Sequence, residues 1–124
     1  MRYTVPGIQY FKAMESKRQQ RISRLLQKDL GEIFQHEVGN LSGGAMITVT
    51  KVHVTRDLAL SRVYLSLFGT KDKKSLLEAI RKHKSEIKYK LGNRIRNQLR
   101  SVPDLEFYED DSLDYIDNIE RLLD

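Results

Sequence analysis

The chain has 124 residues, of which 40% are hydrophobic and 31% charged, so its length and composition predict a single globular domain with one core. It contains no Cys and no Trp, which excludes disulfides, thiolate catalysis and Cys-ligated zinc or iron–sulfur sites. No apolar run approaches the roughly 18 residues of a membrane span, and the N-terminus lacks a secretory leader. We therefore expect a soluble, cytoplasmic protein with no membrane partner.

The net charge of +5 conceals two regions of opposite sign. Residues 1–100 hold 21 Lys or Arg against 8 Asp or Glu, a balance of +13, whereas residues 101–124 hold one Arg against nine acidic residues, a balance of −8. A basic body attracts phosphates through counterion release. The acidic tail either limits indiscriminate binding or keeps the protein soluble, and the sequence leaves both possibilities open.

Residues 1–13 include Pro6 and Gly7 and show no sustained periodicity. They are predicted to be an N-terminal appendage, either disordered or the product of an upstream start, and residues 14–124 to form the domain. A first helix is expected over residues 16–38, because its apolar residues follow the i, i+3, i+4 spacing of a core-facing helix and Ser16 can cap its start.

Cations crowd the first half of this helix, although the positive end of a helix dipole disfavours them. Their retention indicates an external anion as their partner. These cations are Lys17, Arg18, Arg21, Arg24 and Lys28.

Two strands are expected next. Residues 45–55 alternate β-branched and polar side chains, with a skip in phase near Thr50 and Lys51 that predicts a bulge. Residues 60–68 form the second strand, and the short turn between the two predicts an antiparallel hairpin. Residues 39–44, which join the first helix to the hairpin, are interpreted as a flexible link because they lack the glycine spacing of a phosphate-binding loop.

A second helix from about residue 71 continues in phase into a third, and the small sheet beneath them requires a kink, which we expect at residues 82–86. The third helix should bury a stripe with a spacing of four, made of Ile87, Leu91, Ile95 and Leu99. Pro103 ends it, a third strand carries Leu105 and Phe107, and a short helix over residues 113–123 follows. The order predicts an α+β fold with helices on one face of a small sheet.

The other side of the third helix is strongly basic, since eight Lys or Arg and one acidic residue lie between Arg81 and Arg100. Cations, amides and the flat ring of Tyr89 suit RNA, although a solvated basic helix would show the same pattern. The predicted phosphate contacts are Lys84, Lys88, Lys90, Arg94, Arg96 and Arg100, together with Arg21, Arg24 and Lys28 of the first helix, and Tyr89 is the predicted stacking residue.

No catalytic chemistry is predicted. His36, His53 and His83 fall on three separate elements without ligand-like spacing, and no nucleophile motif is present. We expect no catalytic residue, no metal, no cofactor and no small-molecule substrate.

Several stretches resemble bacterial ribosome-binding factor A. The run DLALSRVYLS at residues 57–66 is similar to the D-L-x-x-A-x-V-y-v-S signature of that family, Pro103, Leu105 and Phe107 match its P-E-L-x-F, and Asp110 with Ser112 matches the D-x-S that follows. The resemblance extends from about residue 14 to the C-terminus. It implies a single type II KH-like domain, α-β-β-α-(kink)-α-β with a short C-terminal helix. It also implies binding to free small ribosomal subunits and their rRNA during late maturation and cold adaptation. We expect the protein to be a monomer.

Two features differ from the family pattern. His83-Lys84-Ser85 stands where the family has Ala-x-Gly at the kink, so we expect a bend without glycine, with Ser85 in a non-helical position. Ser61 replaces the usual Ala of the second strand. The chain also lacks the G-x-x-G loop with which ordinary KH domains clamp nucleotides. Two alternatives are a KH-like protein acting on messenger or small RNA, and a subunit of an RNA-modifying enzyme or nuclease.

Overall fold

The structure, a computed structural model, describes residues 15–110, so the predicted appendage (1–13) and the predicted last helix (113–123) lie outside the described residues. Its elements are α2 (Lys17–His36), α3 (Gly39–Ser42), β1 (Met46–Val54), β2 (Leu60–Phe68), α4 (Lys73–Lys82), α5 (Lys84–Ile95) and β3 (Asp104–Glu109). The predicted α+β class and the α-β-β-α-kink-α-β order of a KH-like domain are confirmed. The predicted flexible link is wrong in part, because α3 forms there and ends at Gly43 and Gly44, which adopt the positive φ angles that glycine favours.

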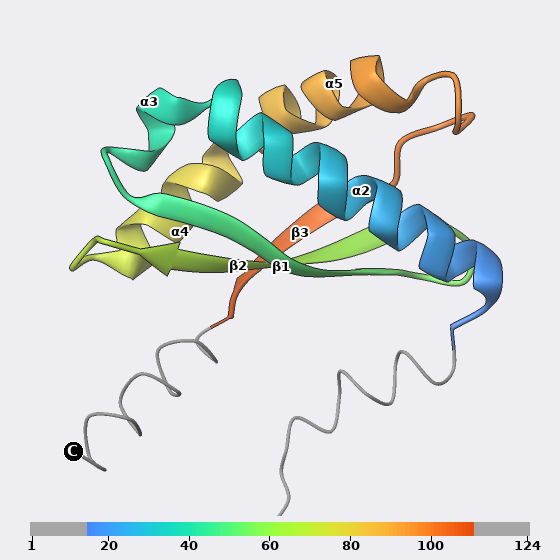
Figure 1. Ribbon diagram of the computed structural model, residues 1–124, viewed down its shortest axis with the longest axis horizontal. Helices are drawn as coiled ribbons and strands as arrows, with labels where there is room; N and C mark the ends of the chain where they lie inside the picture. Colours follow the sequence, from blue (N-terminus) through green and yellow to red (C-terminus); the bar gives the residue numbers. More distant parts are fainter. Residues whose placement is uncertain (1–14, 111–124) are drawn as a thin grey trace, which may run out of the picture.

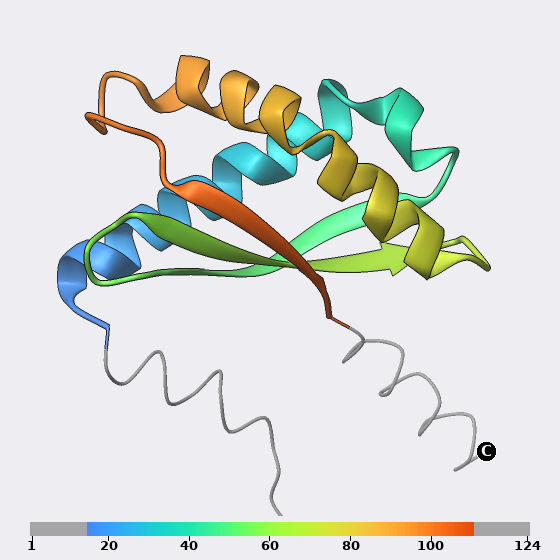
Figure 2. The same ribbon diagram turned by 180° about the vertical axis from the view of Figure 1, so that it is seen from behind.

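The sheet has the strand order β1-β2-β3, and Figures 1 and 2 show the helices of the described chain on one of its faces. β1 and β2 pair antiparallel, as their short connection predicts. β2 and β3 pair parallel, because α4 and α5 carry the chain back across the sheet before β3 begins. β1 and β3 are therefore the two edge strands.

The predicted bulge in β1 is confirmed. The register shifts between Val49 and Lys51, so that Val49 pairs with Leu65 and Lys51 with Tyr64. Side chains alternate between the two faces of a strand, and one extra residue restores the phase. Val52 and Val54 consequently point into the core, as Ile47 and Val49 do before the bulge.

A capping box starts α2. The backbone N–H of Gln19 donates to Ser16 Oγ over 3.1 Å, and the Ser16 N–H donates to Gln19 Oε1 over 2.9 Å. The predicted cap at Ser16 is therefore confirmed. From this start, the apolar side of α2 packs on the sheet, and Leu26, Leu30 and Ile33 are fully buried.

A single residue, His83, separates α4 from α5 and makes the predicted bend. Its φ of −96° and ψ of 15° lie in the bridge region of backbone space, which L-amino acids can adopt, so the missing glycine is no obstacle. The expectation for Ser85 is wrong, because this residue lies in the first turn of α5. The helix also ends earlier than predicted, at Ile95, and of the predicted stripe Leu99 lies beyond it and is only partly buried.

Candidate nucleic-acid interface

Arg94, a predicted RNA contact, lies in a cluster of carboxylates from α2 and the residue that follows it. Its Nη2 is 2.8 Å from Glu37 Oε2, and its Nη1 contacts Glu32 and lies 3.5 Å from Asp29 Oδ1. Hydrogen bonds to Glu37 and then to Glu32 raise the pKa of the Arg94 guanidinium. Arg94 therefore fastens α5 to α2, and its charge is already compensated within the protein.

Three lysines of α5 are also paired. Lys84 Nζ and Lys88 Nζ lie 3.5 Å and 3.6 Å from the same Asp104 oxygen at the start of β3. Lys90 Nζ lies 3.9 Å from Glu37 Oε1. The hydrogen bond from the Leu105 backbone, together with these two lysine charges, lowers the pKa of Asp104. The dense positive field predicted for this helix is thus partly neutralised by acidic residues that are distant in sequence.

The remaining candidates around α5 are exposed. The Tyr89 side chain is 71% exposed. Arg96 and Arg100 follow the last turn of the helix, are exposed, and form no ion pair within residues 15–110. These three residues keep the surface properties that the sequence predicts.

The cations of α2 behave differently from those of α5. Lys17, Arg21, Arg24 and Lys28 follow one another at helical spacings of four, three and four, which places them on one side of α2. All four are exposed, and none has an ion-pair partner in the described part of the chain. We call these four residues the α2 cation row. The first turn of α2 contains no acidic residue that would compensate them.

A hollow of about 410 Å³ connects the start of α2 to the segment after α5. It is lined by Arg18, Arg21, Ile22, Leu25, Gln98 and Leu99. Leu25, predicted as core, is only partly buried because it faces this hollow. The hollow thus places Arg18 and Arg21 of α2 beside residues 98 and 99, which lie between Arg96 and Arg100 in the sequence.

The opposite edge of the sheet is less open to a ligand. Arg81 of α4 donates to the Phe107 carbonyl oxygen, from Nη2 over 2.7 Å and from Nε over 3.2 Å, and so occupies an outward-facing acceptor of β3. With no G-x-x-G loop at the α4–α5 junction, this side lacks the clamp of ordinary KH domains.

Within residues 15–110, no group of three His, Asp or Glu residues is placed to hold a metal ion. Over the same residues, no helix is both long enough and apolar enough to cross a membrane.

The sequence profile of the family Ribosome-binding factor A matches residues 18–123. The chain belongs to the ribosome-binding factor A family. It is similar to the ribosome-binding factor A of Christiangramia forsetii, with 47% identity over 109 residues that cover 86% of this chain and 82% of the relative. The protein of that name from Cytophaga hutchinsonii is 39% identical over 110 residues, covering 89% and 83% of the two chains.

Solved structures of ribosome-binding factor A share the KH-like fold. The crystal structure of the Thermus thermophilus protein superposes with a TM-score of 0.60 at 24% identity, covering 73% of this chain and 94% of that one. The solution structure from Thermotoga maritima gives 0.60 at 23% identity, covering 80% and 93%. A homology model of the Thermus thermophilus ribosome-binding factor A, fitted into the cryo-electron microscopy map of its complex with 30S, gives a TM-score of 0.57 at 22% identity, covering 72% of this chain and 91% of that one.

The sequence does not predict the buried polar residues of α2. Gln19, Ser23 and Asp29 are 5%, 7% and 8% exposed. Gln19 and Ser23 recur with Gln27 at a spacing of four, which is the one sequence signal for a polar helix side turned towards the protein. For Asp29, the sequence signal is its negative charge, because the residue is acidic within a stretch of basic residues.

Proposed function

We propose that the chain is a non-catalytic assembly factor that binds free small ribosomal subunits through their rRNA during late maturation. The observation that carries the proposal is the α2 cation row, whose exposed side chains have no ion-pair partners among residues 15–110. Fixed cations without internal counterions gain most from neutralising phosphates, because they release bound ions without breaking an internal salt bridge. Family membership and the 30S complex of the Thermus protein support the choice of polyanion.

The predicted contacts divide into two classes within this proposal. Arg21, Arg24 and Lys28 of the row, with Arg96 and Arg100 after α5, neutralise phosphates directly. Tyr89 stacks on an unpaired base, since its ring is exposed. Lys84, Lys88, Lys90 and Arg94 contribute less, because each would exchange a carboxylate for a phosphate.

The protein acts as a monomer in the cytoplasm, needs no cofactor, and serves subunit maturation in the cold. The rival target, messenger or small RNA, is less favoured because the family relatives carry the name of ribosome-binding factors.

Binding to purified free small subunits, measured by sedimentation at several salt concentrations, tests the proposal. The triple substitution Arg21→Gln, Arg24→Gln and Lys28→Gln should weaken binding strongly. It should also lower the slope of log K against log salt by about three, one for each lost phosphate contact.

A matched triple variant provides the control. Lys71→Gln, Lys74→Gln and Lys82→Gln remove the same charge from exposed positions in and before α4. Binding should change little. Equal weakening by both triples would indicate a nonspecific charge effect and contradict the proposed surface, and equal affinity of the wild-type chain for unstructured RNA would favour the rival target.

A further inference from the structure

One side of α2 faces the outer edge of β1 with polar residues. Gln19 Nε2 donates to the Val54 carbonyl oxygen over 2.8 Å, and Gln27 Nε2 donates to the carbonyl oxygens of Val49 and Thr50, each over 3.3 Å. These bonds satisfy outward-facing acceptors of an edge strand that would otherwise be exposed. The polar side of α2 therefore complements β1 at both ends of the contact.

Ser23 lies midway between the two glutamines in the sequence, but its hydroxyl forms no such hydrogen bond to β1. The residue is only 7% exposed, and its Oγ has no hydrogen-bond partner among the described residues. A buried hydroxyl without a partner costs stability, and Ala would suit the helix better. Val52 lies opposite Ser23. The backbone N–H and C=O groups of Val52 point to the same edge of β1 as those of Val54, which is two residues further along the strand. Ser23 thus supplies an unused donor and acceptor at this position.

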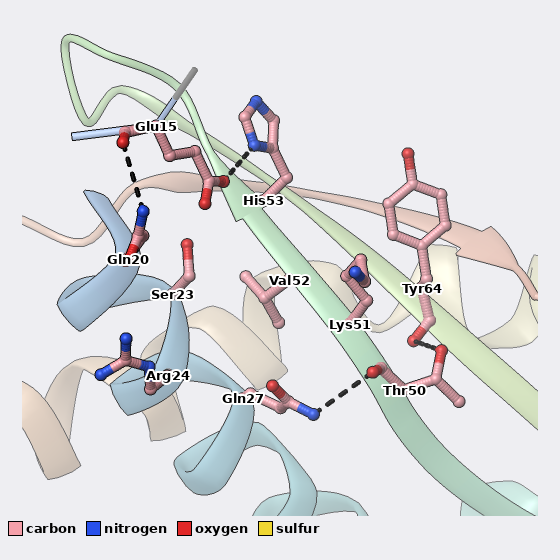
Figure 3. A pocket seen from close by; sticks show the side chains of 10 residues that line it. All are labelled: Glu15, Gln20, Ser23, Arg24, Gln27, Thr50, Lys51, Val52, His53 and Tyr64. Atoms are coloured by element: carbon pink, nitrogen blue, oxygen red, sulfur yellow. Dashed lines mark hydrogen bonds and ion pairs between the residues drawn. The ribbon is translucent and has the colours of Figure 1, made fainter. Parts of the chain in front are cut away.

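Ser23 opens into a pocket of about 260 Å³ between α2 and β1, shown in Figure 3. Arg24 and Lys51 also line it, and neither forms an ion pair within residues 15–110. The one acidic residue of the lining, Glu15, is turned onto His53, with 2.5 Å between its Oε2 and the ring Nδ1. The pocket therefore combines two available cations with an unused hydroxyl, which is a set of groups that binds an anion.

An aromatic residue of β2, Tyr64, also lines the pocket. Tyr64 of β2 stacks on Tyr108 of β3 with ring centroids 5.5 Å apart and an interplanar angle of 28°. Because β2 lies between β1 and β3, the other side of the Tyr64 ring faces towards β1, where Lys51 is its partner in the sheet register. Nucleobases stack on such rings irrespective of sequence.

We propose that this pocket binds one unstacked nucleotide of single-stranded RNA. The base lies against Tyr64, Arg24 and Lys51 neutralise the phosphate, and the Ser23 hydroxyl forms a hydrogen bond to the nucleotide. The inference rests on the proposed function in that small-subunit RNA supplies the nucleotide. All of these contacts are made to one nucleotide, so a free nucleotide should bind to the pocket without the rest of the RNA.

Titration of the ¹⁵N-labelled full chain with AMP and with UMP, followed by NMR, tests this proposal. Saturable shifts should appear at Ser23, at residues 51–53 and at Tyr64. Ser23→Ala should raise the dissociation constant by about three- to tenfold, the loss of one hydrogen bond. Arg24→Gln should weaken binding by at least as much, and Lys74→Gln, which removes the same charge from an exposed position in α4, should not.

The outcomes separate this pocket from the subunit-binding surface. Inorganic phosphate that binds as tightly as the nucleotides, shifts confined to other elements, or no saturable shift would each overturn the proposal. Ser23→Ala is expected to fold at least as stably as the wild type, so a loss of affinity in this variant is not a loss of structure. Subunit binding without nucleotide binding would leave the proposed function standing and remove the pocket, and the reverse result would remove the function alone.

Discussion

At the scale of single residues, the structure distinguishes positive charges that are paired within the protein from those that are not. Arg94 and Arg96 are two residues apart and look alike in the sequence, yet Arg94 contacts Glu32 and Glu37, and Arg96 has no ion pair within residues 15–110. A charge with internal counterions stabilises the fold, whereas a charge without them is available to a ligand. Reversing the charge of Arg94 should therefore harm the fold, whereas reversing the charge of Arg96 should not.

Arg94→Glu should lower the free energy of unfolding by about 1–3 kcal/mol, because it replaces attraction by repulsion beside three carboxylates at a partly exposed site. Urea denaturation with an unchanged m-value would measure the loss. Arg96→Glu is the control and should stay within about 0.5 kcal/mol of the wild type while weakening RNA binding. Equal stability of the two variants would mean that the carboxylate cluster contributes nothing.

At the scale of elements, the chain bends sharply at the junction between α4 and α5. A Leu76–Leu99 helix without interruption would exceed the sheet, and the chain solves this with one residue outside helical geometry, His83. Ser85 is already helical, so the family's glycine position is occupied by a residue in the first turn of α5.

Ser85→Gly should therefore destabilise the protein by up to about 0.5 kcal/mol, because glycine loses more backbone entropy in a helix than serine does. Thermal melts would measure the change, with Ser101→Gly, an exposed residue outside helices and strands, as the comparison. Amide exchange should be faster at residues 84–86 than in the flanking turns, since the first N–H groups of a helix lack intrahelical acceptors. A stabilising effect of Ser85→Gly would contradict the observed bend position.

At the scale of the whole molecule, the sequence predicts the features that follow from side-chain periodicity. It does not predict contacts between residues that are far apart in the chain. The β2 bounds, the bulge at Thr50 and the buried residues Ile87, Leu91 and Ile95 all agree with prediction, because side-chain period follows directly from backbone geometry. Contacts between Arg94 and acidic residues more than fifty positions earlier could not be predicted, since the sequence gives the sign of a charge but not its neighbours. The same applies to the pocket between α2 and β1.

The pH dependence of stability follows from three carboxylates spread over the fold. Backbone or side-chain hydrogen bonds lower the pKa values of Asp57 in the β1–β2 turn, of Asp72 at the start of α4 and of Asp104 in β3. A pKa lowered in the folded state stabilises the protein above the unfolded value, near 3.8, and this contribution disappears as pH falls through the folded pKa. The urea concentration at the midpoint of denaturation should therefore decrease when the pH is lowered below about 4. The substitution Asp104→Asn should make this decrease smaller. A midpoint that does not change between pH 5 and pH 3 would contradict this assignment.

The N-terminal boundary of the folding unit lies close to the start of α2. The family match begins at residue 18, and the described chain begins at Glu15, which contacts His53 of β1. A chain that starts at Met14 keeps this contact and the Ser16 cap, so it should melt within about one or two degrees of the full chain and bind subunits equally well. A chain that starts at Ser16 loses the Glu15–His53 pair and should melt lower. If the chain starting at Met14 instead lost several degrees, Tyr10 and Phe11 would be part of the core and the domain would have to be redrawn to include residues 1–13.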